Sequence, residues 1–391
     1  MAMSDADMSM VSEIMRDFAK RTGLSPAGSS PERYLWTDSF AVCNCLGLYR
    51  QTGDARYRDL ALRLVDQVHG VLGRHRPDDR RTGWISGLNE EEGQRHPTAG
   101  GLRIGKKMNE RGPDEPFDDQ LEWDRDGQYF HYLTQWMHAL DCVSRVAGDA
   151  LFNKWAVELA KGIHSRFAYE PRRGEEKRLH WKMSIDLSYP LVPSMGHHDP
   201  LDGLITYAEL QATHARLSDR TPSQALNKEI ADMARICAGK NWATDDALGI
   251  GGLLAAAYRI ARLPAAGGYA DSLLEAVLQD GLSSLAYFSR RSSLGLPAEY
   301  RLAFRELGLA IGLQAIQKLT KLAGRHPDVF QIPLGRVNVK GFEPYLALTE
   351  TINAFWMEKK NQESAVWKEH RNINMVMLAT SLAPDGYLSD P

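Results

Sequence analysis

The sequence predicts an all-α protein in which about six helical hairpins close into a toroid. Three observations predict this fold: apolar residues recur at three- and four-residue spacing along almost the whole chain, convincing strand patterns are missing, and a helix–turn–helix unit repeats. The first helix of each pair is the more apolar, whereas the second is amphipathic and rich in charge. An inner ring of buried helices inside a half-solvated outer ring would produce this difference.

The repeat is clearest in two hairpins. The stretch "RQTGDARYRDLALRL" around Gly53 is answered by "RVAGDALFNKWAVEL" around Gly148. In both stretches the glycine suits the left-handed residue that ends a helix, and the aspartate after it, Asp54 or Asp149, suits the cap of the next helix.

The remaining elements follow in order along the chain. A leading helix is expected over residues 8–22. Five helix pairs are expected over 38–72, 127–167, 200–239, 246–288 and 342–382, and one long single helix is expected over 299–324. No Pro/Gly/Ser-rich linker interrupts them, so residues 1–391 are predicted to form a single domain, with long loops at about 75–126 and 169–199.

Composition excludes several classes of function. The chain has 391 residues, 43% of them hydrophobic, a net charge of −3 and no long basic run, which argues against a nucleic-acid or anionic-membrane partner. The start "MAMSDADMSM" does not resemble a secretory signal, and no apolar run approaches the roughly 18 residues of a membrane span. We therefore expect a cytoplasmic protein, of undetermined oligomeric state.

The cysteines are scattered and are expected to be buried, reduced thiols. Cys43 and Cys45 lie about 200° apart around a helix and cannot clamp one ion together, while Cys142 and Cys237 lie in apolar helix faces. A metal site made of His180, Asp186, His197 and Asp199 lacks a recognised ligand spacing. Neither a metal nor a cofactor is expected.

Unusual residues gather where inner helices begin. The segments that precede these helices are 35–38, 122–127, 197–203, 241–246, 297–301 and 341–345. Each contains a carboxylate and three contain a tryptophan. Because the first helices of hairpins in a toroid all start at the same end, these segments and the two long loops should meet in one place.

The hairpin pattern "TGDxRYxDLAxxLxD" and the aromatic and acidic residues before inner helices resemble the six-hairpin, (α/α)6-barrel carbohydrate-active enzymes. That superfamily includes unsaturated glucuronyl hydrolases, N-acylglucosamine 2-epimerases and inverting glycosidases. The resemblance implies the fold and a sugar substrate. It matches no single family's catalytic signature, so no catalytic residue is carried over from it.

Sugars stack their C–H faces on aromatic rings and bind carboxylates, arginine and histidine through their hydroxyls. The partner is therefore expected to be a small-molecule or oligosaccharide substrate. The expected substrate-binding residues are Trp36, Asp38, Glu122, Trp123, Asp126, Tyr129, His180, Trp181, His197, His198, Trp242, Asp246, Tyr300 and Arg301. Helix capping is the competing interpretation for Asp38, Asp126, Asp199 and Asp245, and for Asp126 it is preferred.

Glycoside hydrolysis is the function favoured by the crowded acids. One protonated carboxyl would serve the leaving oxygen and a second carboxylate would activate water or attack, with inversion favoured. The expected catalytic residues are Asp124, Asp199, Asp202, His131 and Glu343.

Three other functions stay open. A sugar epimerase or isomerase would use His131 with His180, His197 or His198, because neutral histidine suits proton transfer near pH 7. A non-catalytic toroid would bind a glycan or a protein. A terpenoid-cyclase-like toroid would need a metal-binding acid run, of which "DDQLE" at 118–122 is a poor version.

Overall fold

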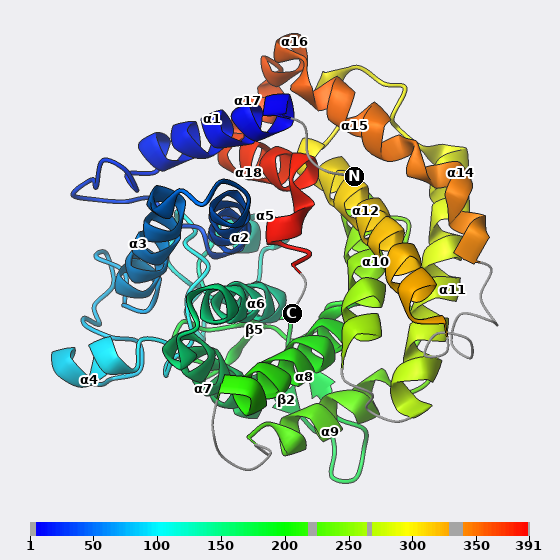
Figure 1. Ribbon diagram of the computed structural model, residues 1–391. Coiled ribbons are helices and arrows are strands. Elements are labelled where there is room, and N and C mark those ends of the chain that lie inside the picture. Colours follow the sequence, from blue (N-terminus) through cyan, green and yellow to red (C-terminus); the bar gives the residue numbers. More distant parts are fainter. Residues whose placement is uncertain (1–4, 218–224, 264–267, 328–338, 390–391) are drawn as a thin grey trace. The chain divides into compact units, whose positions relative to one another are not determined.

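The computed structural model describes residues 5–217, 225–263, 268–327 and 339–389, and most of them are helical (Figure 1). The predicted all-α character is therefore confirmed. Among these residues, no helix is long and apolar enough to cross a membrane. The chain divides into two compact units: residues 19–238, called the N-unit below, and residues 239–390 with 1–18, called the C-unit. The single domain expected over 1–391 stays a prediction.

Three helical hairpins build the N-unit. Their helices are α2 (Leu35–Thr52) with α3 (Ala55–Leu72), α6 (Phe130–Ala147) with α7 (Ala150–Phe167), and α8 (Asp199–Leu217) with α9 (Asn227–Cys237). Helix α2 packs on α6, and α6 packs on α8 (Figure 1). The three pairs predicted for this part of the chain are confirmed.

The two repeated turns have the predicted geometry. Gly53 and Gly148 end their helices with φ of 70° and 66°, the left-handed region that glycine enters without steric cost. Asp54 accepts a hydrogen bond from the amide of Arg56 at 3.0 Å, and Asp149 accepts one from the amide of Leu151 at 2.9 Å. Each aspartate thus caps the returning helix.

Burial separates the two helices of a pair as predicted. Helix α2 buries every residue from Leu35 to Leu48, whereas α3 buries one stripe, which includes Leu64, Val65 and Val68. The first turns of α2, α6 and α8 lie together, so these three helices run in the same direction.

The two long connections of the N-unit contain short elements. The first contains α4 (Glu90–Arg95) and α5 (Asp119–Asp124); the second contains β3 (Arg178–Leu179), β4 (Lys182–Met183) and β5 (Pro190–Val192). Strand β1 (Gln128–Tyr129) pairs with β4, which pairs with β5, and β2 (Ala168–Tyr169) pairs with β3, all antiparallel. Because β1 leads directly into α6, the small sheet holds both loops against the start of that helix.

The C-unit is also helical. Its helices are α1 (Asp5–Arg21, of which residues beyond 18 fall in the N-unit), α10 (Ala247–Arg262), α11 (Gly268–Arg291), α12 (Ala303–Arg325), α14 (Glu343–Leu346), α15 (Leu348–Met357), α16 (Lys359–Gln362), α17 (Ala365–Glu369) and α18 (Arg371–Leu382). Helix α12 packs against α10, α15 and α18.

The last predicted pair differs from the expectation that its first helix is the inner one. The amide of Phe304 donates to the Asn374 side chain at 3.0 Å, and the Gln314 amide donates to the carbonyl of Ser381 at 2.8 Å, so α18 runs parallel to α12. Helix α18 is buried almost throughout, while α15 buries one stripe. The inner helix of this pair is therefore α18.

Candidate functional site

The first turns of three helices meet in the N-unit. The hydroxyls of Tyr34, before α2, and Tyr132, in α6, lie 2.6 Å apart. The rings of Trp36 and Tyr132 are 6.5 Å apart between centroids. Nδ1 of His131, also in α6, lies 3.8 Å from a carboxylate oxygen of Asp199, the first residue of α8. The structure thus brings together five residues from three separate parts of the chain, and three of them (Trp36, His131 and Asp199) were expected at the site.

His131 and Asp199 form the acid–base part of this cluster. Burial lowers the pKa of His131 to about 4, so its imidazole is neutral at pH 7. Burial, with the neighbouring Asp202 carboxylate, raises the pKa of Asp199 well above its ordinary value. The His131 side chain keeps 29% of its surface exposed, and Asp199 keeps 6%. A neutral base therefore lies beside a carboxyl that keeps its proton to unusually high pH, and solvent reaches the base.

A series of aromatic rings extends from this pair to the surface. Tyr129 lies 5.7 Å from the His131 ring and 5.6 Å from Trp181, between centroids. Trp181 in turn lies 5.8 Å from Trp123, whose exposed fraction is 55%. Trp123, Tyr129 and Trp181 were all expected substrate-binding residues. Flat ring faces of this kind can stack on the C–H faces of a sugar ring.

Lys106 also lies at this cluster, and the sequence analysis did not include it among the expected site residues. Its ammonium lies 5.5 Å from the centre of the Tyr34 ring. Burial, and then the Lys182 ammonium, lower the pKa of Lys106, while Asp124 and Asp126 oppose the change. Asp124, one of the expected catalytic residues, is exposed at the end of α5, and its charge acts on the Lys106 ammonium. In the sequence Lys106 stands in "GGLRIGK", where no local pattern distinguishes it from a surface lysine.

Asp126 does not cap α6, contrary to expectation. Strand β1 intervenes, and the residue that precedes the helix is Tyr129. The carboxylate is fully buried and accepts bonds from Arg103 at 2.8 Å and from the amide of Gly105 at 2.9 Å, with Arg76 at 3.3 Å. Asp126 therefore stabilises the long connection that contains Arg76, Arg103 and Gly105, and its carboxylate has no exposed surface for a ligand.

Glu122 is also used within the protein. Its side chain accepts from the fully buried Lys182 at 2.8 Å and from Arg111 at 3.2 Å. Lys182 donates in addition to the carbonyls of Glu122 and Arg125, both at 2.9 Å. This ion pair joins the end of α5 to β4, so Glu122 stabilises the loop that carries Trp123. Contrary to the expectation that it binds substrate, its carboxylate is occupied by Lys182 and Arg111.

Asp38, His180, His197 and His198, which were also expected at the site, make contacts of their own. Asp38 is buried in α2, accepts from the amide of Tyr34 at 3.0 Å and lies 3.5 Å from Arg33. Burial raises the pKa of Asp38 to about 6, although Arg33 and the Tyr34 amide oppose it. His180 stacks on Tyr169 with ring centroids 4.0 Å apart. The rings of His197 and His198 lie 4.7 Å apart in the segment before α8.

The C-unit has a pocket of its own, of about 320 Å³, at the starts of α10 and α12. Asp246 caps α10 by accepting from the amide of Gly249 at 2.9 Å, and it pairs with Arg305 at 2.5 Å. Tyr300, with an exposed fraction of 74%, lies at the rim. Both expected residues, Asp246 and Tyr300, line the pocket. The full lining is Asp245, Asp246, Ala247, Tyr287, Phe288, Arg291, Ser293, Tyr300, Leu302, Arg305 and Glu306.

Two expected residues of the C-unit have structural roles. Arg301 is buried, forms a two-pronged ion pair with Glu306 and stacks 3.6 Å above the Phe355 ring centre. Trp242 is 1% exposed and belongs to the core. Both were expected to bind substrate because the sequence does not reveal which side chains of each segment face the protein core.

Glu343 is not at the end of the C-unit that carries the pocket. The indole of Trp356, at the end of α15, donates to Glu306 at 2.8 Å, so α15 reaches the pocket end with its last turn. Glu343 stands before the start of α15, about 20 Å away at 1.5 Å per residue. The expectation that 341–345 precede an inner helix was wrong, because α18 is the inner helix of that pair.

Comparisons with known proteins bear on the fold. No protein-family model matches the chain, and no curated protein sequence matches it. Among solved structures, a D-mannose isomerase has 10% sequence identity and a TM-score of 0.51, with 96% of this chain and 97% of that chain covered. A cellobiose 2-epimerase from Spirochaeta thermophila DSM 6192 has 11% identity and a TM-score of 0.49, with coverage of 96% and 97%. A sugar epimerase from a ruminal bacterium has 11% identity and a TM-score of 0.48, with coverage of 89% and 87%.

At such low identity a structural likeness defines the fold alone. The likeness to the D-mannose isomerase extends over nearly the whole of both chains. It confirms the predicted fold class, the all-α (α/α)6 type of helical hairpins.

Proposed function

We propose that the protein is a sugar isomerase or epimerase that moves a proton at the carbon beside a sugar carbonyl. The observation that carries the proposal is the pairing of a neutral His131 with the high-pKa carboxyl of Asp199, next to a series of aromatic rings that reaches the surface at Trp123. The fold likeness to a D-mannose isomerase points in the same direction. This function was the alternative in the sequence analysis, and it now takes precedence over hydrolysis.

The proposed chemistry follows from the two groups. His131 takes the proton from the carbon next to the carbonyl of the open-chain sugar, and the C–H electron pair forms a C=C bond as the carbonyl oxygen gains charge. The Asp199 carboxyl donates its proton to that oxygen, giving an enediol. The imidazolium then returns its proton to carbon while Asp199 takes a hydroxyl proton back, so atoms and charges balance over the cycle.

Isomerisation between aldose and ketose is the version that one base can complete. The proton leaves one carbon and returns to its neighbour on the same face of a planar enediol. Epimerisation needs proton return to the opposite face, hence a second base or a turn of the intermediate. The contact between His131 and Asp199 supplies one base and one acid, which are enough for this version, so we favour aldose–ketose isomerisation.

Glycoside hydrolysis is the second candidate, because the raised pKa of Asp199 also suits an acid that protonates a leaving oxygen. The second carboxylate is the difficulty. Asp202 lies one turn further along the same helix, so it would lie on the same side of the glycosidic bond of a bound substrate as Asp199. Hydrolysis needs two carboxyl groups that flank this bond.

Proton NMR of the protein with free aldoses, ketoses and disaccharides in heavy water separates the two. Deuterium entering the carbon beside the carbonyl, with interconversion and no cleavage, is expected. We expect His131→Asn to reduce this exchange by about 100-fold or more, and His96→Asn, a surface histidine paired with Glu158, to leave it unchanged. New reducing ends would support hydrolysis instead, and exchange that survives in His131→Asn would exclude His131 as the base.

A further inference from the structure

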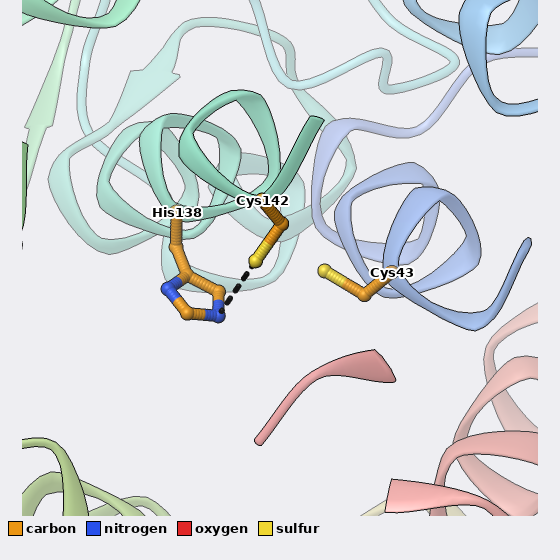
Figure 2. Close-up of side chains that lie close together, drawn as sticks. All are labelled: Cys43, His138 and Cys142. Atoms are coloured by element: carbon orange, nitrogen blue, oxygen red, sulfur yellow. Dashed lines mark hydrogen bonds between the residues drawn. The ribbon is translucent and has the colours of Figure 1, made fainter. Parts of the chain in front are cut away.

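Two cysteines and a histidine form a buried cluster in the interior of the N-unit. Cys43 comes from α2, and His138 and Cys142 come from α6 (Figure 2). One ligand-capable atom of each residue lies within 4.8 Å of the others, and Cys142 Sγ lies 3.7 Å from His138 Nε2. The exposed fractions of Cys43, His138 and Cys142 are 1%, 3% and 1%, so all three side chains are buried.

Helix geometry explains how the cluster forms. His138 and Cys142 are four residues apart on α6, which places both side chains on one face. That face packs against α2, where it meets Cys43 (Figure 2). The sequence analysis compared Cys43 with Cys45, its near neighbour in the chain, whereas its neighbour in space is Cys142.

The surroundings match those of a thiolate–imidazole metal centre. Nδ1 of His138 faces Glu209 of α8 at 3.5 Å, which is the carboxylate–histidine arrangement that orients a metal-binding imidazole. The Arg145 guanidinium donates to Cys142 Sγ at 3.2 Å and lies 3.0 Å from Asp141, so a thiolate at Cys142 has a partner of opposite charge. Two thiolates and a divalent cation sum to zero charge, which suits a buried position.

We propose that Cys43, Cys142 and His138 Nε2 bind one soft divalent cation of the zinc class, with a water molecule as the fourth ligand. In a tetrahedral zinc site with bonds of about 2.0–2.3 Å, neighbouring ligand atoms lie about 3.5–4 Å apart. The three ligand atoms lie within 4.8 Å of one another, so shifts of about an ångström in the side-chain atoms would bring them to this spacing. Oxygen-preferring cations such as magnesium do not suit two sulfur ligands.

The metal centre would stabilise the two helices, α2 and α6, that carry residues of the candidate site. Cys43 follows Trp36 by seven residues on α2, and His138 follows His131 by seven on α6. Seven residues are almost two full turns, so each pair shares a helix face, about 10 Å apart along the axis. A cation there would fix the spacing of the two helices whose first turns carry Trp36 and His131, without touching a bound substrate.

The test uses the full chain purified without chelators. Elemental analysis is expected to find about one zinc per chain. After chelation, cobalt is expected to restore one equivalent, with the near-ultraviolet band of thiolate-to-cobalt charge transfer. Cys43→Ser and Cys142→Ser should lose that band and bind zinc at least about 100-fold more weakly. Cys45→Ser is the matched control, because Cys45 is buried in the same helix outside the cluster.

A second variant keeps the test decisive if the serine variants fail to fold. Glu209→Gln leaves all three ligands in place and should weaken zinc binding by about 10- to 100-fold. The proposal is overturned if the stripped protein takes up no stoichiometric zinc or cobalt, or if Cys43→Ser binds as tightly as Cys45→Ser. Thiol counting that finds Cys43 and Cys142 joined in a disulfide would overturn it too. None of these measurements depends on the proposed isomerase activity.

Discussion

Asp126 and Asp199 are both buried aspartates of the N-unit, but their surroundings differ. Asp126 is held by Arg103, Arg76 and two backbone amides. Asp199 lies near His131 and Asp202, and no cation lies against it in the described part of the N-unit. A carboxylate surrounded by donors stabilises the fold, whereas a carboxyl kept in an apolar place without a cation destabilises it at neutral pH. Such a residue is retained for another reason, and catalysis is the one we propose.

Replacing Asp126 should therefore weaken the fold. We expect Asp126→Asn to lower the free energy of unfolding by about 3–5 kcal/mol, because it leaves a buried arginine without its charge partner. Urea unfolding followed by circular dichroism measures the loss. Asp78→Asn is the control, since Asp78 pairs with Arg76 from an exposed position and should cost less than about 1 kcal/mol. Equal effects of the two changes would contradict the assignment.

Replacing Asp199 should have the opposite effect on stability while it removes activity. The folded-state pKa of Asp199 is raised, so its contribution to stability is complete below the unfolded value near 4 and is lost as pH rises from there. Asn does not ionise, so Asp199→Asn should be more stable than the wild type at pH 7, with the difference vanishing near pH 4. Urea midpoints at both pH values test this. A lower midpoint at pH 7 would mean that Asp199 is mainly structural.

Contact between helices α10 and α12 depends on glycine. A Cβ atom on Gly251 would overlap the carbonyl of Gly308, and one on Gly312 would overlap the backbone of Gly251. The two helices therefore approach closely along this face. The small-residue composition of inner helices was visible in the sequence, but which glycine touches which helix was not.

Neighbouring glycines of α10 should respond with opposite signs. Gly251→Ala is expected to destabilise the protein by about 1–3 kcal/mol, because backbone atoms cannot move aside as a side chain would. Gly252→Ala, where the added methyl meets nothing within 4 Å, should stabilise it by about 0.5–1 kcal/mol through helix propensity. Thermal unfolding of both variants measures the contrast, and similar midpoints would argue against close packing at Gly251.

At the scale of the whole molecule, buried titratable groups act in two directions. Burial raises the pKa of Asp38 and Asp141 to about 6 and lowers the pKa of His69 to about 3 and of His131 to about 4. The carboxyl contributions are complete below the unfolded value near 4 and are lost as pH rises through about 6. The histidine contributions are complete above the unfolded value near 6.5 and are lost as pH falls toward 3–4.

These opposing slopes predict a broad stability profile. Between pH 4 and 6 the carboxyl and histidine contributions offset each other, so the urea midpoint should change little. Below pH 4 only losses remain, because carboxylates with lowered pKa, such as Asp79 and Asp232 at about 2, begin to lose their ion pairs. A series of urea midpoints from pH 3 to 8 tests this. A steep, steady rise from pH 4 to 7 would contradict it.

The sequence by itself determined the helices, the hairpin turns and the fold class, because these depend on short-range patterns: apolar spacing, a left-handed glycine at 53 or 148, and an aspartate cap after each. It also placed Trp36, His131 and Asp199 near one another, since parallel inner helices must begin together. Only the tertiary structure decided the roles of the acids. Three examples are the contact of Asp126 with Arg103, the position of Glu343 away from the pocket end of its unit, and the meeting of Cys43 with Cys142. All three depend on long-range packing, because residues far apart in the chain supply the charges and surfaces that set the chemistry of each side chain.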